Sequence, residues 1–504
     1  MTLSQNAYFK LGQYKHLQKI DEKLSKMTRH HINVIMQGIG WRNRALHASS
    51  RIAGSTTEGG MTARIFYPNK KHGGKINKEI ETDVELVYCE FPIECRNRIE
   101  DIEGKPGYLR MRFDEKTLSL IEKKEHREKA REAITEDGYI SSKKLKKTFC
   151  EHAMYDGKVL QLIMCAALNL DPDNVEFKKS SDTLTKASVE TSVTMYINGE
   201  YKGSVSWDVV ISVKIPWWPS VAQEWVTRHR KWPEKDVIAE LTQHGFMITK
   251  SSDEEMENND TIENRYSFSH VEIQLSEKYS RQQKLVYLVF KSMIYRWLKP
   301  IDPDRVSSFL GKTIMCWMVE ENPPEDSYWD EDDETLLFTV RTMFQRLLDA
   351  LLKGILQYYF IPSINVIEKM PQQLRMNLVD KVMEILEDTE SYLPENIEAV
   401  IEFSNFIRDA AKKTHSFAEE YFQKGIKAFL DKPKLYKLIV EIVAKKMKKE
   451  SEYVGKKVLD NQSWLHDKEE VEIAYEDFNF KFEVPRVAVD IANALFKGFD
   501  NLED

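Results

Sequence analysis

Long apolar runs are absent from this sequence. Among the longest is Leu285–Phe290, which is far shorter than the roughly 20 apolar residues that a membrane-spanning helix needs. The first residues, Met1–Lys10, also lack the extended apolar core of a secretory signal peptide. We therefore expect a cytoplasmic protein that does not engage a membrane.

Cysteine is scarce, with five residues in a chain of 504. Their odd number and scattered spacing argue against a disulfide framework and suit a reducing compartment. No two form a Cys-x-x-Cys pair, and none is followed by a histidine cluster at zinc-ligand spacing, so we expect no zinc. The cysteines are Cys89, Cys95, Cys150, Cys165 and Cys316.

The formal net charge of −8 argues against nucleic acid as a partner of the chain as a whole. The charge is unevenly distributed, however. Residues Met1–Arg51 contain nine Lys or Arg and two acids, a local balance of +7, whereas acids gather in Asp253–Glu263 and Glu320–Glu334. An acidic protein can thus still present one basic face.

The first fifty residues are predicted to form a long helix. An apolar stripe at steps of three and four residues is typical of a packed helix face, and here it consists of Leu17, Ile20, Leu24 and Met27. An adjacent face, within an arc of about 80°, carries a row of lysines, namely Lys15, Lys19, Lys23 and Lys26. This row could bind nucleic-acid phosphates, or it could be a solvated helix face.

Strands are predicted in the first half of the chain and helices in the second. Glu81–Phe91 is of β type, and Ser188–Ile197 is expected to pair with Gly203–Ile215 as a hairpin across the turn signal Asn198-Gly199. After Trp217-Trp218-Pro219 the sequence becomes mostly helical. The predicted helices are Lys116–Asn169 with a break at Gly138-Tyr139, Leu336–Phe360, Gln372–Leu386, Ile397–Leu430 and Pro433–Leu459.

This order favours an α+β fold with two lobes and a helical tail. The expected domains are a catalytic lobe with a mixed sheet at residues 1–218, a helical lobe at 219–370 and a helical extension at 371–504. Hydrophobic residues make up 42% of the chain and charged residues 31%, which is ordinary for a globular protein with a sizeable core.

Three features could carry chemistry together. Gly54-Ser55 lies in a Gly/Ser/Thr-rich turn, whose amides and hydroxyl could cradle a polyphosphate. In the predicted strand, Glu81, Asp83 and Glu85 alternate onto one face, with carboxylates about 7 Å apart. A later apolar strand contains a lone acid, Asp208, and a buried charge is costly without a partner or metal. The alternatives are a plain surface turn and solvated acids on half-buried strands.

The three carboxylates Glu81, Asp83 and Asp208 would suit two Mg²⁺ or Mn²⁺ ions. Two such ions activate an attacking ribose hydroxyl and stabilise charge on a transferring α-phosphate and leaving pyrophosphate. The Gly54-Ser55 turn would then hold the β- and γ-phosphates.

The sequence resembles the cyclic GMP-AMP synthase-like receptors of the male-abnormal-21 family over roughly residues 10–370. The resemblance rests on several motifs in the same order rather than on any single one. They are Gly-Ser-x-x-Glu at 54–58, Glu-x-Asp-Val at 81–84, Asp208 in a later strand, Arg265-Tyr-Ser-Phe-Ser-His-Val-Glu272, Ser307-Ser-Phe-Leu-Gly-Lys-Thr313 followed by Asn322-Pro323 and Trp329, and Tyr359-Phe-Ile-Pro362.

The resemblance implies a role for each matching residue. Glu81, Asp83 and Asp208 would be the catalytic metal ligands, and Arg265 would read a base edge through its bidentate fork. Phe309 would stack on a base, where many relatives carry Tyr, although core packing is the alternative. Further nucleotide contacts would come from Gly54, Ser55, Glu58, Ser267, Ser269, Glu272, Lys291 and Ser308.

The resemblance also implies an activator. In this family the first helix is the spine that touches duplex phosphates, so Lys15, Lys19, Lys23 and Lys26 would bind nucleic acid. The vertebrate DNA sensor carries a His/Cys zinc insertion, and the matching stretch Leu275–Lys284 is short and has neither residue. We therefore expect double-stranded RNA rather than double-stranded DNA, and a homodimer on nucleic acid is left open.

The leading hypothesis is thus a nucleic-acid-activated synthase that makes a cyclic dinucleotide from ATP, GTP or other triphosphates in innate immunity. A catalytically inactive family member that serves as a nucleotide- or nucleic-acid-binding scaffold is the alternative. A template-independent polymerase is a third hypothesis, against which the Arg265–Glu272 segment argues. The extension beyond the family domain carries a basic run, Lys445–Lys449, that could dock, bind nucleic acid or be solvated.

Overall fold

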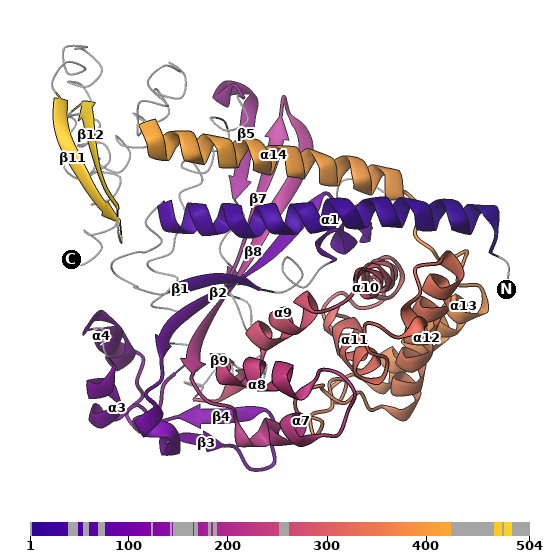
Figure 1. Cartoon of the computed structure of the whole chain (residues 1–504), viewed down its shortest axis with the longest axis horizontal. Helices are drawn as coiled ribbons and strands as arrows, with labels where there is room; N and C mark the ends of the chain where they lie inside the picture. The colour runs from indigo at the N-terminus through magenta and orange to yellow at the C-terminus, as the bar shows by residue number, and fades with distance from the viewer. Residues whose placement is uncertain are drawn as a thin grey trace.

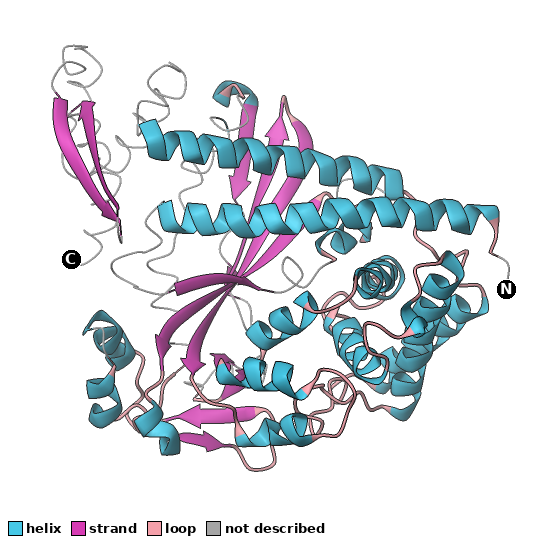
Figure 2. Cartoon of the chain, in the orientation of Figure 1, coloured by secondary structure: helices cyan, strands magenta, loops and turns pink. Residues whose placement is uncertain are grey.

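The structure is a computed structural model in which a mixed β-sheet and a group of helices form two lobes (Figure 1). Two long helices, α1 and α14, lie side by side across both lobes (Figure 2). The described residues are 3–38, 49–53, 60–68, 76–121, 124–141, 144, 165, 170–179, 183–184, 189–250, 262–424, 468–475 and 478–485.

The main sheet has the strand order β1-β2-β8-β9-β10-β4-β3, with β7 pairing on β8 and the short strands β5 and β6 pairing on β7. The β2–β8 pair is parallel, and the other described pairs are antiparallel. The strands are β1 Ser49–Ala53, β2 Glu79–Glu90, β3 Ile99–Asp101, β4 Tyr108–Met111, β5 Val175–Lys179, β6 Thr183–Leu184, β7 Val189–Ile197, β8 Glu200–Ile215, β9 Phe246–Lys250 and β10 Asn264–Ser267.

The predicted hairpin is confirmed. Strands β7 and β8 are antiparallel and connected by Asn198 and Gly199, both with positive φ, 52° and 79°. Positive φ at both central residues is the requirement of a type I′ turn, which Asn-Gly meets at little cost. The hairpin brings β8 to the centre of the sheet, where it pairs with β2 along most of its length.

The helix predicted in the first fifty residues is confirmed over α1 Gln5–Gly38, whereas Ser49 and Ser50, at the end of that range, belong to strand β1. Three members of its apolar stripe, Leu17, Ile20 and Leu24, are buried, and the side chain of the fourth, Met27, lies outside the described part of the structure. The helix α14 Ile397–Lys424 runs parallel to it. Two hydrogen bonds join α1 to the start of α14 and the residues just before it. Lys10 Nζ donates to the Leu393 carbonyl at 2.8 Å, and Gln13 donates to Glu398 at 3.0 Å.

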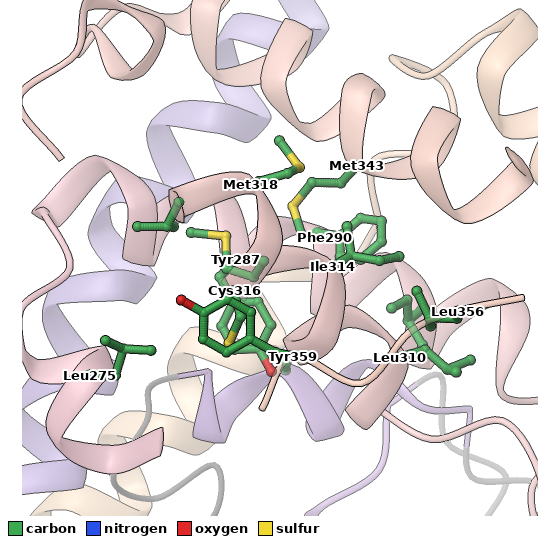
Figure 3. Packing of buried hydrophobic residues seen from close by; sticks show 14 of the residues in the cluster. Leu275, Tyr287, Phe290, Leu310, Ile314, Cys316, Met318, Met343, Leu356 and Tyr359 are labelled. Carbon is green, nitrogen blue, oxygen red and sulfur yellow. The ribbon is translucent and has the colours of Figure 1, made fainter. Parts of the chain in front are cut away.

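The helical lobe packs around α10, and Figure 3 shows part of its core, with Phe290, Ile314 and Met343 side by side. The capping box of Ser280 and Gln283 starts α10. The helices are α7 Gln223–Thr227, α8 Lys235–Gln243, α9 Ser269–Glu277, α10 Arg281–Met293, α11 Phe309–Glu321, α12 Asp333–Lys353 and α13 Gln372–Glu387, besides α3 Glu115–Leu120 and α4 Lys124–Glu132 near the sheet. Shorter turns are η1 Met61–Phe66, η2 Ile93–Arg98, η3 Pro172–Asn174, η4 Ser220–Ala222, η6 Ile294–Leu298 and η7 Ser327–Trp329.

Several sequence predictions of elements were wrong in extent. The helix expected to reach Phe360 ends at Lys353, because Gly354 takes a left-handed φ of 69° and caps it. The mostly helical region after Pro219 still contributes β9 and β10 to the main sheet. Of the helical region predicted at Lys116–Asn169, the described residues contain the short helices α3 and α4, and the predicted break at Gly138-Tyr139 is present, because Gly138 has a φ of 80° and Tyr139 and Ile140 form β-bridges with Arg112 and Ile134.

The extension is not purely helical. Strands β11 Lys468–Tyr475 and β12 Phe478–Pro485 form an antiparallel pair of their own. The predicted helix Pro433–Leu459 and its basic run Lys445–Lys449 lie outside the described residues, as do residues 253–261 of the acidic segment Asp253–Glu263. Among the helices that the structure describes, none is both long and apolar enough to cross a membrane.

Candidate active site

The structure brings three predicted carboxylates together at the centre of the sheet. Glu81 and Asp83 lie on β2 and Asp208 lies on β8, and the parallel register places Asp83 beside Asp208. One carboxylate oxygen from each residue lies within 4.8 Å of the others, and all three side chains are half-buried. Two strands far apart in the sequence thus form one acidic cluster.

The alternation of β2 explains which side chains enter the cluster. Thr82 and Val84 point to the opposite face and are buried. Glu85, which the sequence placed on the same face as Asp83, stands apart from the cluster. It is 3% exposed and accepts a hydrogen bond from the Ser269 hydroxyl at 3.0 Å. The predicted nucleotide contact Ser269 is therefore joined to β2 by Glu85.

An arginine that the sequence analysis missed lies beside the cluster. Arg64, on η1, contacts Glu81 with one terminal nitrogen and lies 3.3 Å from Glu79 with the other. Glu79 also accepts a hydrogen bond from Asn77 at 3.0 Å. Arg64 compensates part of the negative charge on this edge of the cluster. Nothing in the pattern of the short η1 segment marked it beforehand.

A second group of side chains gathers around Glu272, which is 8% exposed at the start of α9. Lys312 forms an ion pair with it at 2.6 Å, and the Tyr358 hydroxyl donates to it at 3.0 Å. Burial and the charge of Glu272 raise the pKa of Tyr358, whereas the charge of Arg265 lowers it. Lys312 and Tyr358 were also missed, since only the fold brings them to Glu272.

The predicted stacking residue Phe309 begins α11 and is half-buried. Its ring lies 5.5 Å from that of Tyr358, and Lys312 Nζ lies 5.3 Å from its centre. Arg265 is exposed on β10, and Ser267 is half-buried on the same strand. The charge of Arg265 acts on Tyr358, the neighbour of Phe309. An aromatic face and a guanidinium are groups that can hold a planar base.

Tyr295 lies near both the acidic cluster and the start of α11. Burial raises its pKa, and the charge of Arg64 and a hydrogen bond from Ser308 oppose that shift. The charge of Asp83 also raises it. The predicted phosphate contact Ser308 therefore lies on the side of the helical lobe that faces the carboxylates.

Lys291 is more deeply buried than a surface phosphate contact, at 2% exposed. It lies against Gly60, at whose position an added Cβ would stand 3.1 Å from Lys291 Cδ. The predicted phosphate-binding residues Gly54, Ser55 and Glu58 lie outside the described residues. Their assignment stays a prediction, as do the roles of Arg265, Ser267, Ser269, Glu272, Ser308 and Phe309.

The predicted lysine row splits in two. Lys19, Lys23 and Lys26 are exposed on α1. Lys15 instead forms an ion pair with Asp333 at the start of α12, with 2.8 Å between Nζ and Oδ1. Three lysines thus form an exposed basic face, whereas the fourth joins α1 to the helical lobe.

The acidic cluster fits a divalent metal. Carboxylate oxygens are the ligands that Mg²⁺ and Mn²⁺ prefer, and the three residues can direct theirs to one place. The four described cysteines are buried and free, and none of them belongs to the metal-ligand group in the described part of the chain.

Comparison with known proteins gives a consistent result. Residues 75–277 match the Mab-21 protein nucleotidyltransferase domain, and residues 285–384 match the Mab-21 protein HhH/H2TH-like domain. The chain is also similar to "Protein mab-21-like" of Drosophila melanogaster, at 24% identity over 332 residues that cover 60% of this chain and 82% of that protein. The first match contains the acidic cluster, and α14 lies beyond both.

Proposed function

The chain belongs to the Mab-21 family and carries its nucleotidyltransferase domain, and from this we propose that it synthesises a cyclic dinucleotide in response to double-stranded RNA. The substrates would be ATP, GTP or other nucleoside triphosphates. The reaction joins a ribose hydroxyl of one nucleotide to the α-phosphate of another and releases pyrophosphate. A second transfer closes the ring. The product would act in innate immune signalling in the cytoplasm.

The observation that carries the proposal is the convergence of Glu81, Asp83 and Asp208. A solvated acidic face would not require a third carboxylate from another strand, and acids held this close repel one another. Their proximity is expected where a bound cation offsets the repulsion. The match to a nucleotidyltransferase domain supports the same chemistry.

The residues divide the work by location. Glu81, Asp83 and Asp208 would hold two Mg²⁺ or Mn²⁺ ions, which when bound favour ionisation of the ribose hydroxyl and stabilise the leaving pyrophosphate. Arg265 and Phe309 would hold a base. Lys312 and Tyr358 both contact Glu272, which would place a carboxylate beside the bound base. Ser55, Ser308 and Lys291 would contact the phosphates.

The activator would bind the exposed face of α1. Lys19, Lys23 and Lys26 can neutralise phosphates but carry no base code, so they would recognise duplex shape, as A-form RNA is usually recognised. Binding should be independent of sequence and should weaken as salt rises. Lys15 contributes less, since Asp333 already neutralises it.

A second candidate function is binding without turnover. It is favoured by the contact of Arg64 with Glu81 and Glu79, because a guanidinium at a metal ligand competes with a cation for that carboxylate. In this alternative, the protein would hold nucleotide or nucleic acid as a scaffold. Metal binding separates the two, since a scaffold of this kind would not need two divalent ions.

Product analysis tests the proposal directly. The protein is incubated with all four triphosphates, Mg²⁺ or Mn²⁺, and either duplex RNA or duplex DNA of equal length. A cyclic dinucleotide formed mainly with RNA is the expected result. Linear oligonucleotides would indicate a polymerase, no product would indicate a scaffold, and stronger stimulation by DNA would overturn the choice of activator while leaving the enzyme class.

A further inference from the structure

One buried carboxylate of α1 has no role in the proposed chemistry. Asp21 is 3% exposed, and three hydrogen bonds converge on it. Its Oδ2 accepts from the backbone N–H of Gly60 at 2.9 Å. Its Oδ1 accepts from the Thr62 backbone N–H at 2.7 Å and from the Thr62 hydroxyl at 2.8 Å. Asp21 therefore binds the residues that begin η1.

The geometry at Gly60 shows how closely this segment is held. Gly60 has a φ of 73°, which only glycine adopts readily, and a Cβ there would meet Lys291 at 3.1 Å. Burial raises the pKa of the Asp21 carboxyl, whereas the hydrogen bonds from Thr62 and Gly60 and the charge of Lys291 lower it. The start of η1 is thus held between an acid of α1 and a lysine of α10.

The other end of η1 reaches the acidic cluster. Arg64 lies two residues after Thr62 and contacts Glu81 and Glu79. The Asn77 backbone N–H also donates to the Ile65 carbonyl at 2.8 Å, which joins η1 to the residues before β2. A short segment therefore connects α1 to a candidate metal ligand, and the structure describes every residue between its two contacts.

We propose that Asp21 is a positioning residue that fixes η1 to α1 and so transmits the position of α1 to Arg64, Lys291 and the acidic cluster. Lys19 and Lys23 lie two residues to either side of Asp21 and are exposed. A duplex bound to these two lysines would therefore shift the helical turn that carries Asp21. The inference rests on the proposed function for the duplex that Lys19 and Lys23 would hold and for its activity readout.

Two other buried polar residues of α1, Gln18 and Tyr14, make different contacts. Gln18 donates to the Arg281 carbonyl at 2.7 Å and so joins α1 to the start of α10. Tyr14 stacks against Phe66 with 5.7 Å between ring centres, an apolar contact that tolerates sliding. Within the described residues, Asp21 by contrast accepts hydrogen bonds from Gly60 and Thr62 and so joins α1 to the first residues of η1.

The test uses the full-length protein and three variants, Asp21→Asn, Thr62→Val and Thr62→Ser. Asp21→Asn replaces an acceptor by a donor opposite the Gly60 or Thr62 amide and removes the charge. Thr62→Val removes only the hydroxyl, whereas Thr62→Ser keeps it and serves as the matched control. Turnover with and without duplex RNA, duplex affinity and hydrogen exchange of residues 60–66 are measured well below the melting temperature.

In Asp21→Asn, RNA-stimulated kcat should fall about tenfold, and exchange across 60–66 should accelerate, while the dissociation constant for RNA stays within about twofold. Thr62→Val should lose about threefold of the stimulated kcat, because one of three bonds is removed. Thr62→Ser should behave as wild type. Basal turnover should fall less than stimulated turnover, since the variants weaken transmission of duplex binding.

A wild-type stimulation ratio and wild-type exchange in Asp21→Asn would overturn the inference. Equal losses of basal and stimulated turnover, shared by Thr62→Ser, would also overturn it, because they would show a general effect on the fold. If Asp21→Asn fails to fold, the Thr62→Val and Thr62→Ser pair makes the same comparison. If the wild type lacks turnover, the proposed function fails. The role of Asp21 is then tested by hydrogen exchange alone, and it is supported if RNA changes the exchange rate of residues 60–66 in wild type but not in Asp21→Asn.

Discussion

Asp208→Asn removes one of the three carboxylates between β2 and β8, and it should stabilise the metal-free protein. Asp83 and Asp208 are neighbours in the parallel register, with ligand oxygens within 4.8 Å. Two unit charges at that distance repel by roughly 3–4 kcal/mol at an effective dielectric constant of 20. Both side chains are half-buried, so solvent screening reduces the effect to about 1–2 kcal/mol.

The same substitution should abolish stabilisation by metal. A ligand present at 100 times its dissociation constant raises stability by about 2.7 kcal/mol, and the wild type should gain this with Mn²⁺. At roughly 1 °C per kcal/mol for a chain of 504 residues, Asp208→Asn should melt about 1–2 °C higher than wild type in EDTA and show no rise on adding Mn²⁺.

Thermal unfolding with EDTA and with a Mn²⁺ series measures both effects. Asp137→Asn is the matched control, because Asp137 is an exposed acid in a turn and lies outside the cluster. It should melt as wild type in both conditions. Equal melting of Asp208→Asn and wild type in EDTA, or an unchanged Mn²⁺ response in the variant, would refute the assignment of the cluster as a metal site.

Three further predictions concern other parts of the molecule. Arg265→Ala should raise KM for one triphosphate about ten- to a hundredfold, since a lost bidentate base contact costs about 1–3 kcal/mol; an unchanged KM and product spectrum would exclude base recognition. Changing Lys19, Lys23 and Lys26 together to Glu should remove RNA binding in a filter or fluorescence assay without lowering the melting temperature, because all three are exposed; retained binding would place the duplex elsewhere. Burial raises the pKa of the Cys89 thiol to about 12, so about one thiol in ten thousand is ionised at pH 8, and iodoacetamide should label it only after unfolding.

The sequence predicted those parts of the fold that depend on local pattern. The spacing of Leu17 and Leu24 predicts the buried face of α1, and Asn198-Gly199 predicts the turn between β7 and β8. The two-residue period of β2 placed Glu81 and Asp83 on one face. Proximity to Asp208 required the further assumption that two distant strands pair, which the parallel register bears out.

Other parts could not be predicted, because they depend on contacts between distant segments. Asp21 and Arg64 look like ordinary charged residues until η1 is seen between α1 and β2. Glu85 follows the same alternation as Asp83, but its burial against Ser269 gives it a structural role. A helical continuation through Gly354 was favoured by the apolar residues that follow, although a glycine at that point is a signal for a helix end.

The β11–β12 pair has a signal of its own in the sequence. In β11, Val471 and Ile473 alternate with acids, and in β12, Phe480 and Phe482 alternate with polar residues. Alternation of this kind predicts strands. Because the preceding segments carry strong helical periodicity, the whole extension was predicted as helical.

The measurement that tests the central claim most directly is pyrophosphate release by the double variant Glu81→Ala/Asp83→Ala with RNA, Mn²⁺ and triphosphates. Both residues lie in the acidic cluster, whereas the exposed lysines lie on α1. The account predicts that the double variant releases no pyrophosphate above background while it binds duplex RNA with wild-type affinity. Continued pyrophosphate release by the double variant would contradict the claim that this cluster catalyses nucleotidyl transfer.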